Sequence, residues 1–199
     1  AAISIEIEGE SVINLWGGYQ DANRSRAWQE DTLCNTFSVS KAMTSACILK
    51  LIEERKIDLY EKVSFYWPEY GCNGKEDTKI IDLLTHRAGM FAFEDNFTIT
   101  NEDWTNWNLF VTKLAKQKPF YTPGSTQSYH ALTFGFLVGE VVRRVDGRSL
   151  GTYFKEKIAD NYNIDFIFGL GNEDINRTSD IVMSKIRSPI LAKAFFSMP

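Results

Sequence analysis

Long apolar runs and an excess of positive charge are both lacking from this sequence. No apolar stretch reaches the length of about 20 residues that a membrane-spanning helix needs, so we expect no membrane span. Lysine and arginine total 22 against 26 aspartate and glutamate residues, for a net charge of −4. A chain with this mixed balance carries no basic stripe, which makes nucleic acid and anionic membrane surfaces poor candidates as partners.

Histidine and cysteine, the residues that build most metal sites, are also scarce. The two histidines, His86 and His130, do not fall in a metal-binding spacing, and the three cysteines include no Cys-x-x-Cys pair. Phosphate-binding loops and dinucleotide fingerprints are missing as well, so no metal or cofactor is expected. Because the sequence has no G-x-S-x-G motif, a Ser-His-Asp triad is disfavoured too.

The odd number of cysteines bears on the cellular compartment. Cys34, Cys47 and Cys72 in a chain of 199 residues favour a reducing compartment over a disulfide scaffold, and Cys47 stands in an apolar helical pattern typical of a core. No basic and apolar leader segment is recognisable. These observations leave the localisation open, with a lean toward an intracellular protein, and they leave the oligomeric state open.

Hydrophobic residues make up 44% of the chain, enough for a sizeable core. Residues 2–19 alternate between apolar and polar about a Gly9-Glu10 turn, which predicts a β-hairpin with one buried face. Two strands alone are only marginally stable, and no later segment reads as a strong strand, so the partners of the hairpin are expected outside these residues. The later segments have helical periodicity. Helices are predicted from about Ser38 to Arg55, from Thr78 to near Gly89, from Asn101 to Lys118, and from Ala131 to Asp146 with Gly147 as a left-handed cap.

The stretch FSVSKAMTSAC, residues 37–47, places two serines and a lysine at the mouth of a helix. Lys41 follows Ser38 by three residues and therefore lies on the same helical face, where its ammonium can fold back toward the Ser38 hydroxyl. A serine is a poor nucleophile unless a neighbour takes its proton, and the helix N-terminus offers free backbone N–H groups to an oxyanion. The spacing therefore predicts a nucleophile and its base.

Two other interpretations of the same residues stay open on spacing alone. An S-x-x-K match arises about once by chance in a chain of this size, so Ser38 is equally compatible with an N-cap and Lys41 with a solvated first-turn residue. Ser40 is a competing nucleophile, but an adjacent residue points away from Lys41 around the helix, which favours Ser38.

Three longer blocks carry a resemblance to a known family. They read NTFSVSKAMTSACILKLIEERKIDLYEKVSFYWPEY, then IIDLLTHRAGM, then FYTPGSTQSYHALTFGFLVGEVVRRVDGRSLGTYF, and they span most of the chain in order. The sequence resembles the N-terminal portion of the serine β-lactamase-like family, in particular its class C and family VIII carboxylesterase branch. The resemblance implies an α+β fold of the transpeptidase type, with a helical region packed on an antiparallel sheet whose C-terminal strands are missing here. We expect a single incomplete domain over 1–199, with the hairpin at 1–20 and the helical region at about 36–199.

The same resemblance implies the roles of three side chains. Ser38 is the residue that becomes acylated, Lys41 helps to deprotonate it, and Tyr129 serves as a general base or proton shuttle. A phenol beside an ammonium has a lowered pKa, so proton transfer between these groups is feasible near neutral pH. The implied activity is that of a serine hydrolase with an acyl-enzyme intermediate, no cofactor, and a small-molecule ester or amide as substrate.

Several departures from the family pattern affect this interpretation. Ala131 replaces the asparagine whose carboxamide holds the substrate amide in the β-lactamases and peptidases of the family, which favours a carboxylesterase acting on small esters over a β-lactamase or D-Ala peptidase. Arg55 stands where many relatives have a helix-ending glycine, in a left-handed conformation that a non-glycine residue adopts at modest cost. The third motif of the family, a Lys- or His-led triplet ending in glycine, does not occur before Pro199.

Alternatives from other classes remain. The missing third motif is compatible with a catalytically silent relative that serves as a scaffold or self-associating protein, and it makes this chain by itself a poor catalyst. Trp104, Trp107 and Phe110 are candidates for an acyl pocket, but aromatic residues at these spacings are more typical of packing on an amphipathic helix. His86 is expected to be a hydrogen-bonded residue at a helix end rather than a base.

Overall fold

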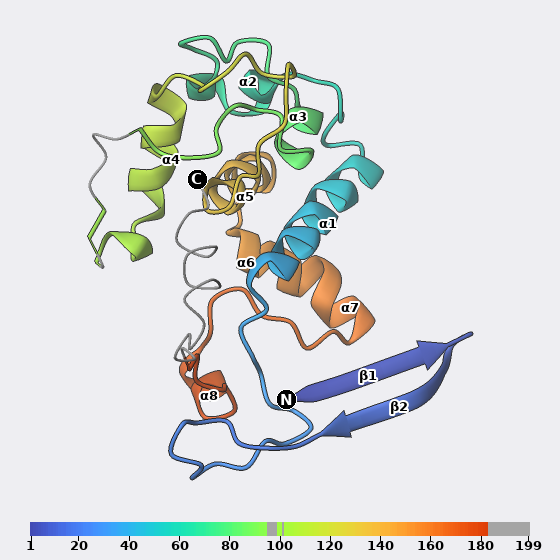
Figure 1. Cartoon of the computed structure of the whole chain (residues 1–199). Helices are drawn as coiled ribbons and strands as arrows, with labels where there is room; N and C mark the ends of the chain where they lie inside the picture. Colours follow the sequence, from blue (N-terminus) through green and yellow to red (C-terminus); the bar gives the residue numbers. More distant parts are fainter. Residues whose placement is uncertain (95–98, 101, 183–199) are drawn as a thin grey trace. The chain divides into compact units, whose positions relative to one another are not determined.

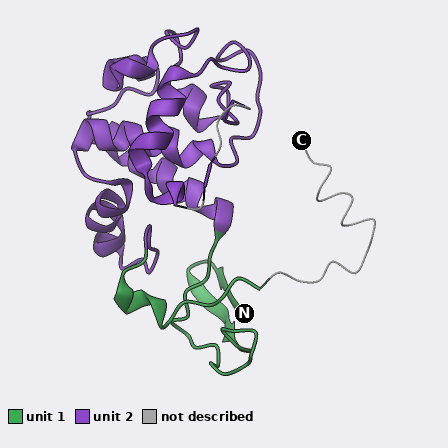
Figure 2. Ribbon diagram, turned by 90° about the vertical axis from the view of Figure 1, so that its left-hand side faces the viewer, with its two compact units in different colours: residues 1–36, 170–199 green, residues 37–169 purple. Residues whose placement is uncertain are grey.

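The structure is a computed structural model that describes residues 1–94, 99–100 and 102–182. The chain divides into two compact units, drawn in different colours in Figure 2. The first comprises residues 1–36 and 170–199, and the second residues 37–169. The expectation of one domain over the whole chain stays a prediction.

The first unit contains the predicted hairpin. Strands β1 (Ala2–Ile7) and β2 (Glu10–Trp16) pair antiparallel, with Ile3 opposite Leu15 and a bulge after Ile5. The turn residues are Glu8 and Gly9, with φ of 52° and 83°, so the turn lies one residue earlier than predicted. Two successive positive φ angles match the right-handed twist of the strands that they join, which is why such turns are favoured in hairpins.

The predicted burial of one hairpin face is wrong. Every residue of β1 and β2 is exposed, including the isoleucines at positions 3, 5 and 7. Within the described residues these are the two strands of a two-stranded sheet, and no third strand pairs with either edge. A hairpin alone has no layer against which to bury its apolar face. The alternation of apolar and polar residues therefore predicts where the strands form but not whether they are buried.

In the first unit, polar contacts join the loop after the hairpin to the segment around residue 180. The segment that follows residue 169 contains α8 (Asn172–Ile175) and returns to the loop after the hairpin. The backbone N–H of Asp180 donates to the Gln20 carbonyl at 2.8 Å, and Leu33 forms an isolated bridge with Thr178. Arg26 reaches the Asp180 carboxylate at 3.2 Å.

The second unit is helical. Within the described residues, no helix is both long enough and apolar enough to cross a bilayer. Its longer helices are α1 (Ser40–Glu53), α4 (Trp107–Lys116) and α5 (Thr133–Asp146). The shorter elements are η1 (Phe37–Val39), α2 (Val63–Tyr66), η2 (Pro68–Tyr70), α3 (Ile80–Leu84), η3 (Asp103–Thr105), α6 (Leu150–Phe154), the π-helical turn η4 (Lys155–Ala159) and α7 (Asp160–Tyr162).

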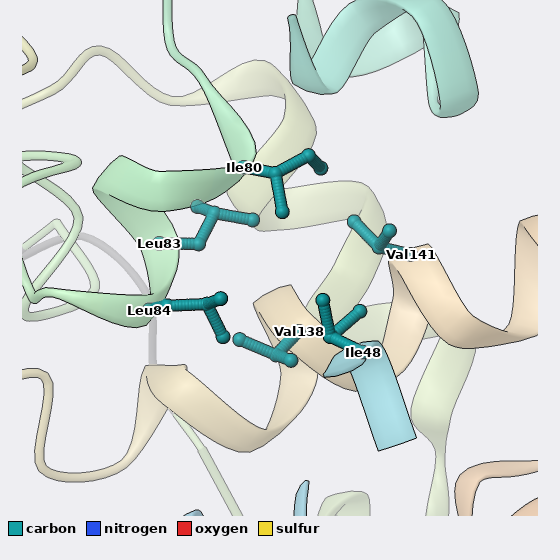
Figure 3. A pocket seen from close by; sticks show the side chains of 6 residues that line it. All are labelled: Ile48, Ile80, Leu83, Leu84, Val138 and Val141. Atoms are coloured by element: carbon teal, nitrogen blue, oxygen red, sulfur yellow. The ribbon is translucent and has the colours of Figure 1, made fainter. Parts of the chain in front are cut away.

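Helix α5 is the centre of this unit, and helices α1, α3, α4 and α6 pack around it (Figure 1). Its apolar side chains are buried, and Gly147 ends it in the predicted left-handed conformation, with φ of 89°. Figure 3 shows where three helices meet, with side chains of α1, α3 and α5 directed into one shared apolar space. These side chains are Ile48, Ile80, Leu83, Leu84, Val138 and Val141.

A buried carboxylate joins α4 to α5. Glu140 is fully buried and accepts hydrogen bonds from the Trp107 indole at 2.8 Å and from Arg143 and Arg144 at 2.7 Å. The Trp107 ring lies against Gly139, where an added Cβ would come within 2.8 Å of the ring. The absence of a side chain at Gly139 leaves room for this ring, and Trp107 packs against α5 as the spacing of the aromatic residues indicated.

Several predicted helix boundaries are wrong, and the last predicted helix begins at Thr133 rather than Ala131. The first helix begins at Ser40 rather than Ser38, because residues 37–39 form a 3₁₀ turn before it. The second ends at Leu84 rather than near Gly89, because His86 adopts a φ of 61° that no helix accommodates. Its start lies at Ile80, with Lys79 rather than Thr78 before it.

The helix predicted from Asn101 to Lys118 is a 3₁₀ turn followed by a separate helix. Asn106 breaks the segment, and its side chain accepts a hydrogen bond from the Leu109 N–H at 3.1 Å, so α4 begins just after this cap. Asn101 itself lies outside the described residues. Arg55 has the predicted left-handed conformation, with φ of 58°.

The Glu140 network yields a stability prediction. Replacing Glu140 with alanine removes the acceptor of the part-buried Trp107 N–H and one acceptor from each of two guanidinium groups, so we expect the free energy of unfolding to fall by about 1–3 kcal/mol in urea denaturation. Burial alone would raise the pKa of Glu140, but hydrogen bonds from Arg143, Arg144 and Trp107 hold it below its usual value. The stabilisation is therefore complete above pH 4.5 and is lost as the pH falls through the folded-state pKa.

The matched control is Glu53→Gln. Its partner, Lys50, lies at 2.6 Å, but the Glu53 side chain is 71% exposed, so the loss should be about 0–1 kcal/mol. Equal losses for the two variants would contradict the importance assigned to the buried network.

Candidate active site

The first predicted site residue, Ser38, lies in the 3₁₀ turn η1 immediately before α1. Phe37 has a φ of 47°, an uncommon conformation for a residue other than glycine, and so the chain turns sharply just before the serine. Ser38 is exposed, whereas α1 continues into the core through Cys47 and Leu51. A hydroxyl at this position is open to a substrate while the helix behind it is fixed by packing.

Lys41 is half-buried and connects the two sequence segments of the site. Its Nζ donates to Ser38 Oγ at 3.3 Å and to the backbone carbonyl of Ala131 at 2.9 Å. The same ammonium lies 4.9 Å from the centroid of the Tyr129 ring and 5.9 Å from that of Phe134, within range of cation–π attraction. The lysine therefore faces the site and not the bulk solvent.

Tyr129 comes from the loop before α5 and completes the cluster. A hydrogen bond from the Ser38 side chain is the main cause that lowers the pKa of the Tyr129 phenol below its usual value of 10.0. Burial opposes this change, and hydrogen bonding and charge from Lys41 add to it. The ring is 53% exposed, so the phenol can be reached from outside. The structure thus brings Ser38, Lys41 and Tyr129 together within the unit 37–169.

Ser40, the competing nucleophile, is differently placed. Its Oγ donates to the Phe37 carbonyl at 2.7 Å, which closes the first turn of the helical segment. No contact between Ser40 and Lys41 or Tyr129 is found among the described residues. Its hydroxyl is therefore used in a local bond to the backbone.

Both histidines support the loop that carries Tyr129. His130 is fully buried, accepts the Met90 N–H through Nε2 at 3.1 Å, and lies 2.7 Å through Nδ1 from the Ser128 carbonyl. Burial lowers the pKa of His130 to about 4, so the ring is neutral at ordinary pH. His86 follows α3 directly, as expected for a residue at a helix end. Neither histidine contacts the Ser38 hydroxyl within the described residues.

The aromatic residues considered for an acyl pocket pack elsewhere. Phe110 is fully buried and stacks with Phe136 at 4.4 Å between centroids, and Trp104 stacks on Phe110 at 5.2 Å. Cys47 is buried in α1, as predicted, and burial raises the pKa of its thiol to about 12. In the part of the chain that the structure describes, no three His, Cys, Asp or Glu side chains come together as metal ligands would.

One member of the site was not predictable from the residue types. The carbonyl of Ala131 anchors the Lys41 ammonium, and a backbone carbonyl has no signature in a sequence. The alanine side chain itself is exposed and presents only a methyl group at the rim of the site.

Comparisons with known proteins identify the family of this chain. The family model described as Beta-lactamase matches residues 1–189. The crystal structure of a family VIII carboxylesterase is 39% identical with a TM-score of 0.85, over 91% of this chain and 50% of that one. A penicillin-binding protein homolog from Caulobacter crescentus is 32% identical with a TM-score of 0.87, over 100% of this chain and 54% of that one.

A curated relative points the same way. The esterase/beta-lactamase LipL of Mycobacterium tuberculosis is 30% identical over 164 residues, which are 82% of this chain and 37% of LipL. The chain thus spans about half the length of these solved structures and just over a third of LipL. The family match and the TM-scores show an α+β fold of the β-lactamase and transpeptidase type, with helices and a small antiparallel sheet. This chain belongs to the beta-lactamase family.

Proposed function

We propose that the protein is a carboxylesterase that works through an acyl-Ser38 intermediate. The observation that carries the proposal is the contact of Lys41 Nζ with Ser38 Oγ at 3.3 Å, beside a tyrosine whose pKa is lowered by the same serine. A hydroxyl that faces both an ammonium and a phenol has the two partners that nucleophilic catalysis needs. The similarity to a family VIII carboxylesterase and to LipL supports the same activity class.

We infer the direction of proton transfer from these contacts. We assign Lys41 as an ammonium that donates to Ser38 Oγ and to the Ala131 carbonyl and so stabilises negative charge on its neighbours. Tyr129 as phenolate takes the Ser38 proton while Ser38 Oγ forms a bond to the acyl carbon. The bond from that carbon to the alkoxide then breaks, and Tyr129 returns the proton to the leaving alcohol. Water hydrolyses the acyl-serine by the same route, and the Ser38 N–H at the helical N-terminus donates to the oxyanion.

Ala131 supports an ester as the substrate. A peptide bond, or the acylamino side chain of a β-lactam, has an N–H that costs free energy when it is buried without an acceptor, whereas a small ester has no such group. The Ala131 methyl group cannot accept this hydrogen bond, and the Ala131 carbonyl already accepts from Lys41 at 2.9 Å. We therefore place small esters before β-lactams and D-Ala peptides.

The proposal predicts covalent labelling at Ser38. In the complete natural chain, a fluorophosphonate probe should add to the wild type, and Ser38→Ala should abolish the adduct and lower esterase kcat by about 10⁴-fold or more. Intact-mass and peptide mass spectrometry measure the adduct.

Ser40→Ala is the matched control for this labelling, because Ser40 is two residues away and its hydroxyl bonds to the Phe37 carbonyl. It should keep the adduct. A wild type that takes up no probe would instead favour a catalytically silent scaffold, and labelling that persists in Ser38→Ala would identify another nucleophile.

The lowered pKa of Tyr129 predicts the pH dependence. Because the phenolate is the active form, kcat/KM should rise with pH through an apparent pKa below 10.0. Tyr129→Phe should lower kcat/KM by roughly 10²–10⁴-fold and remove this limb of the profile. If the limb persists in Tyr129→Phe, the titrating base is another group, and the assignment of the phenol is wrong.

The ester preference predicts the effect of a carboxamide at position 131. Ala131→Asn should raise kcat/KM for nitrocefin relative to a p-nitrophenyl ester by about 2- to 10-fold, the equivalent of one hydrogen bond. Ala131→Val adds bulk without a polar group and serves as the control. A ratio that moves equally in both variants would mean that the methyl group does not set the preference.

A further inference from the structure

His86 bonds to the backbone on both sides of Tyr129. Its carbonyl accepts the N–H of Ser128 at 3.1 Å, and its ring Nδ1 accepts the N–H of His130 at 3.1 Å. Ser128 and His130 are the two chain neighbours of the tyrosine, so one residue holds the peptide groups that flank the phenol. The Tyr121 hydroxyl donates to the same His86 carbonyl at 3.2 Å, which fixes that carbonyl from the other side.

The His86 ring also packs on the phenol itself. Its centroid lies 4.8 Å from that of Tyr129 and 5.0 Å from that of Phe134. These two rings are the ones over which the Lys41 ammonium lies. The His86 ring therefore packs behind the aromatic rings of the site and does not reach Ser38.

The hydrogen bond at Nδ1 requires a neutral imidazole, because a protonated Nδ1 cannot accept. The titratable groups that face the ring are Tyr129, His130 and the Lys41 ammonium. Burial, and secondly the charge of Lys41, lower the pKa of His86, which keeps the acceptor available.

The backbone conformation at residue 86 does not by itself explain why a histidine stands there. Its φ of 61° is a left-handed conformation at the end of α3, where glycine and asparagine are the usual residues. Glycine would satisfy this conformation but would supply neither the acceptor nor the ring. Ending α3 does not require an imidazole. The contacts with the Tyr129 loop do, because they depend on the ring and its Nδ1 acceptor.

We propose that His86 is a positioning residue that holds the Tyr129 phenol against Ser38 and Lys41. This inference rests on the proposed function, in which Tyr129 is the base. His86 acts through the loop and touches neither the serine nor the site of acyl transfer.

The test uses His86→Gly and His86→Asn in the complete natural chain. Glycine keeps the left-handed backbone and removes the ring, so kcat for a p-nitrophenyl ester should fall by about 10²-fold with little change in KM, as expected for a misplaced catalytic group. Asparagine tolerates the same φ and places an amide oxygen near the position of Nδ1, so it should recover at least about tenfold of that loss.

A second readout is independent of catalysis. Ultraviolet difference titration against Tyr129→Phe gives the pKa of this one phenol, which should rise in His86→Gly as the phenol moves away from Lys41 and Ser38, and return in His86→Asn. If fluorophosphonate does not label Ser38 in the wild type, the proposed function fails, while this titration still decides the role of His86.

Gln127→Ala is the matched control. The Gln127 side chain donates to the Thr85 carbonyl at 3.0 Å, so it joins the same two segments without flanking the tyrosine, and its loss should change kcat by less than about threefold. The inference is overturned if Gln127→Ala lowers kcat as much as His86→Gly, if folded His86→Asn is as impaired as His86→Gly, or if the phenol pKa is unchanged in His86→Gly.

Thermal unfolding shows whether His86→Gly folds. If it does not, His86→Asn decides: a folded variant whose kcat stays within tenfold of the wild type, with the wild-type phenol pKa, supports the proposal, and a loss of kcat beyond tenfold overturns it.

Discussion

The Lys41 ammonium is the contact on which the candidate site depends. It lies half-buried between a serine hydroxyl, a backbone carbonyl and an aromatic ring, and two of these three partners come from a segment about ninety residues later in the chain. A cation withdrawn from water is stable only when oxygen acceptors or a π face replace the lost hydration. Ser38, Ala131 and Tyr129 supply these replacements. The Lys41 ammonium therefore connects the residues of the site, and the same residues hold the ammonium in place.

The contact exists because two helices are fixed relative to each other. Ser38 and Lys41 stand at the start of α1, and Tyr129 and Ala131 precede α5. The apolar contacts of Ile48 on α1 with Val138 and Val141 on α5 hold these starts in register (Figure 3). On the other side of α5 the Glu140 network secures α4. The packing of one central helix thus sets distances at the site that no local interaction could set.

The hairpin and the site depend on different parts of the molecule. The whole Ser38, Lys41 and Tyr129 cluster lies within the helical unit of residues 37–169, whereas both strands belong to the other unit. The apolar strand residues are exposed, and the chain spans about half the length of the solved relatives. The fold and the helical sequence blocks therefore identify the family of the chain. The activity of the whole protein is a proposal that rests on the site.

Local interactions explain what was predictable from the sequence. The hairpin, the core face of α1, the Gly147 cap and the three-residue spacing from Ser38 to Lys41 each depend on neighbours within a few positions. The exact starts and ends of α1, α3 and α4 were not predictable, because a positive φ at Phe37 or His86 and the Asn106 cap depend on how the surrounding loops are held.

The sequence by itself determined the family, the α+β class and the identity of three candidate catalytic side chains. Only the tertiary structure decided that a backbone carbonyl at Ala131 anchors the lysine and that His86 holds the peptide groups on both sides of Tyr129. The physical reason is that these bonds join residues about forty or ninety positions apart. Their formation depends on how α1, α3 and α5 pack together and not on any pattern within one segment.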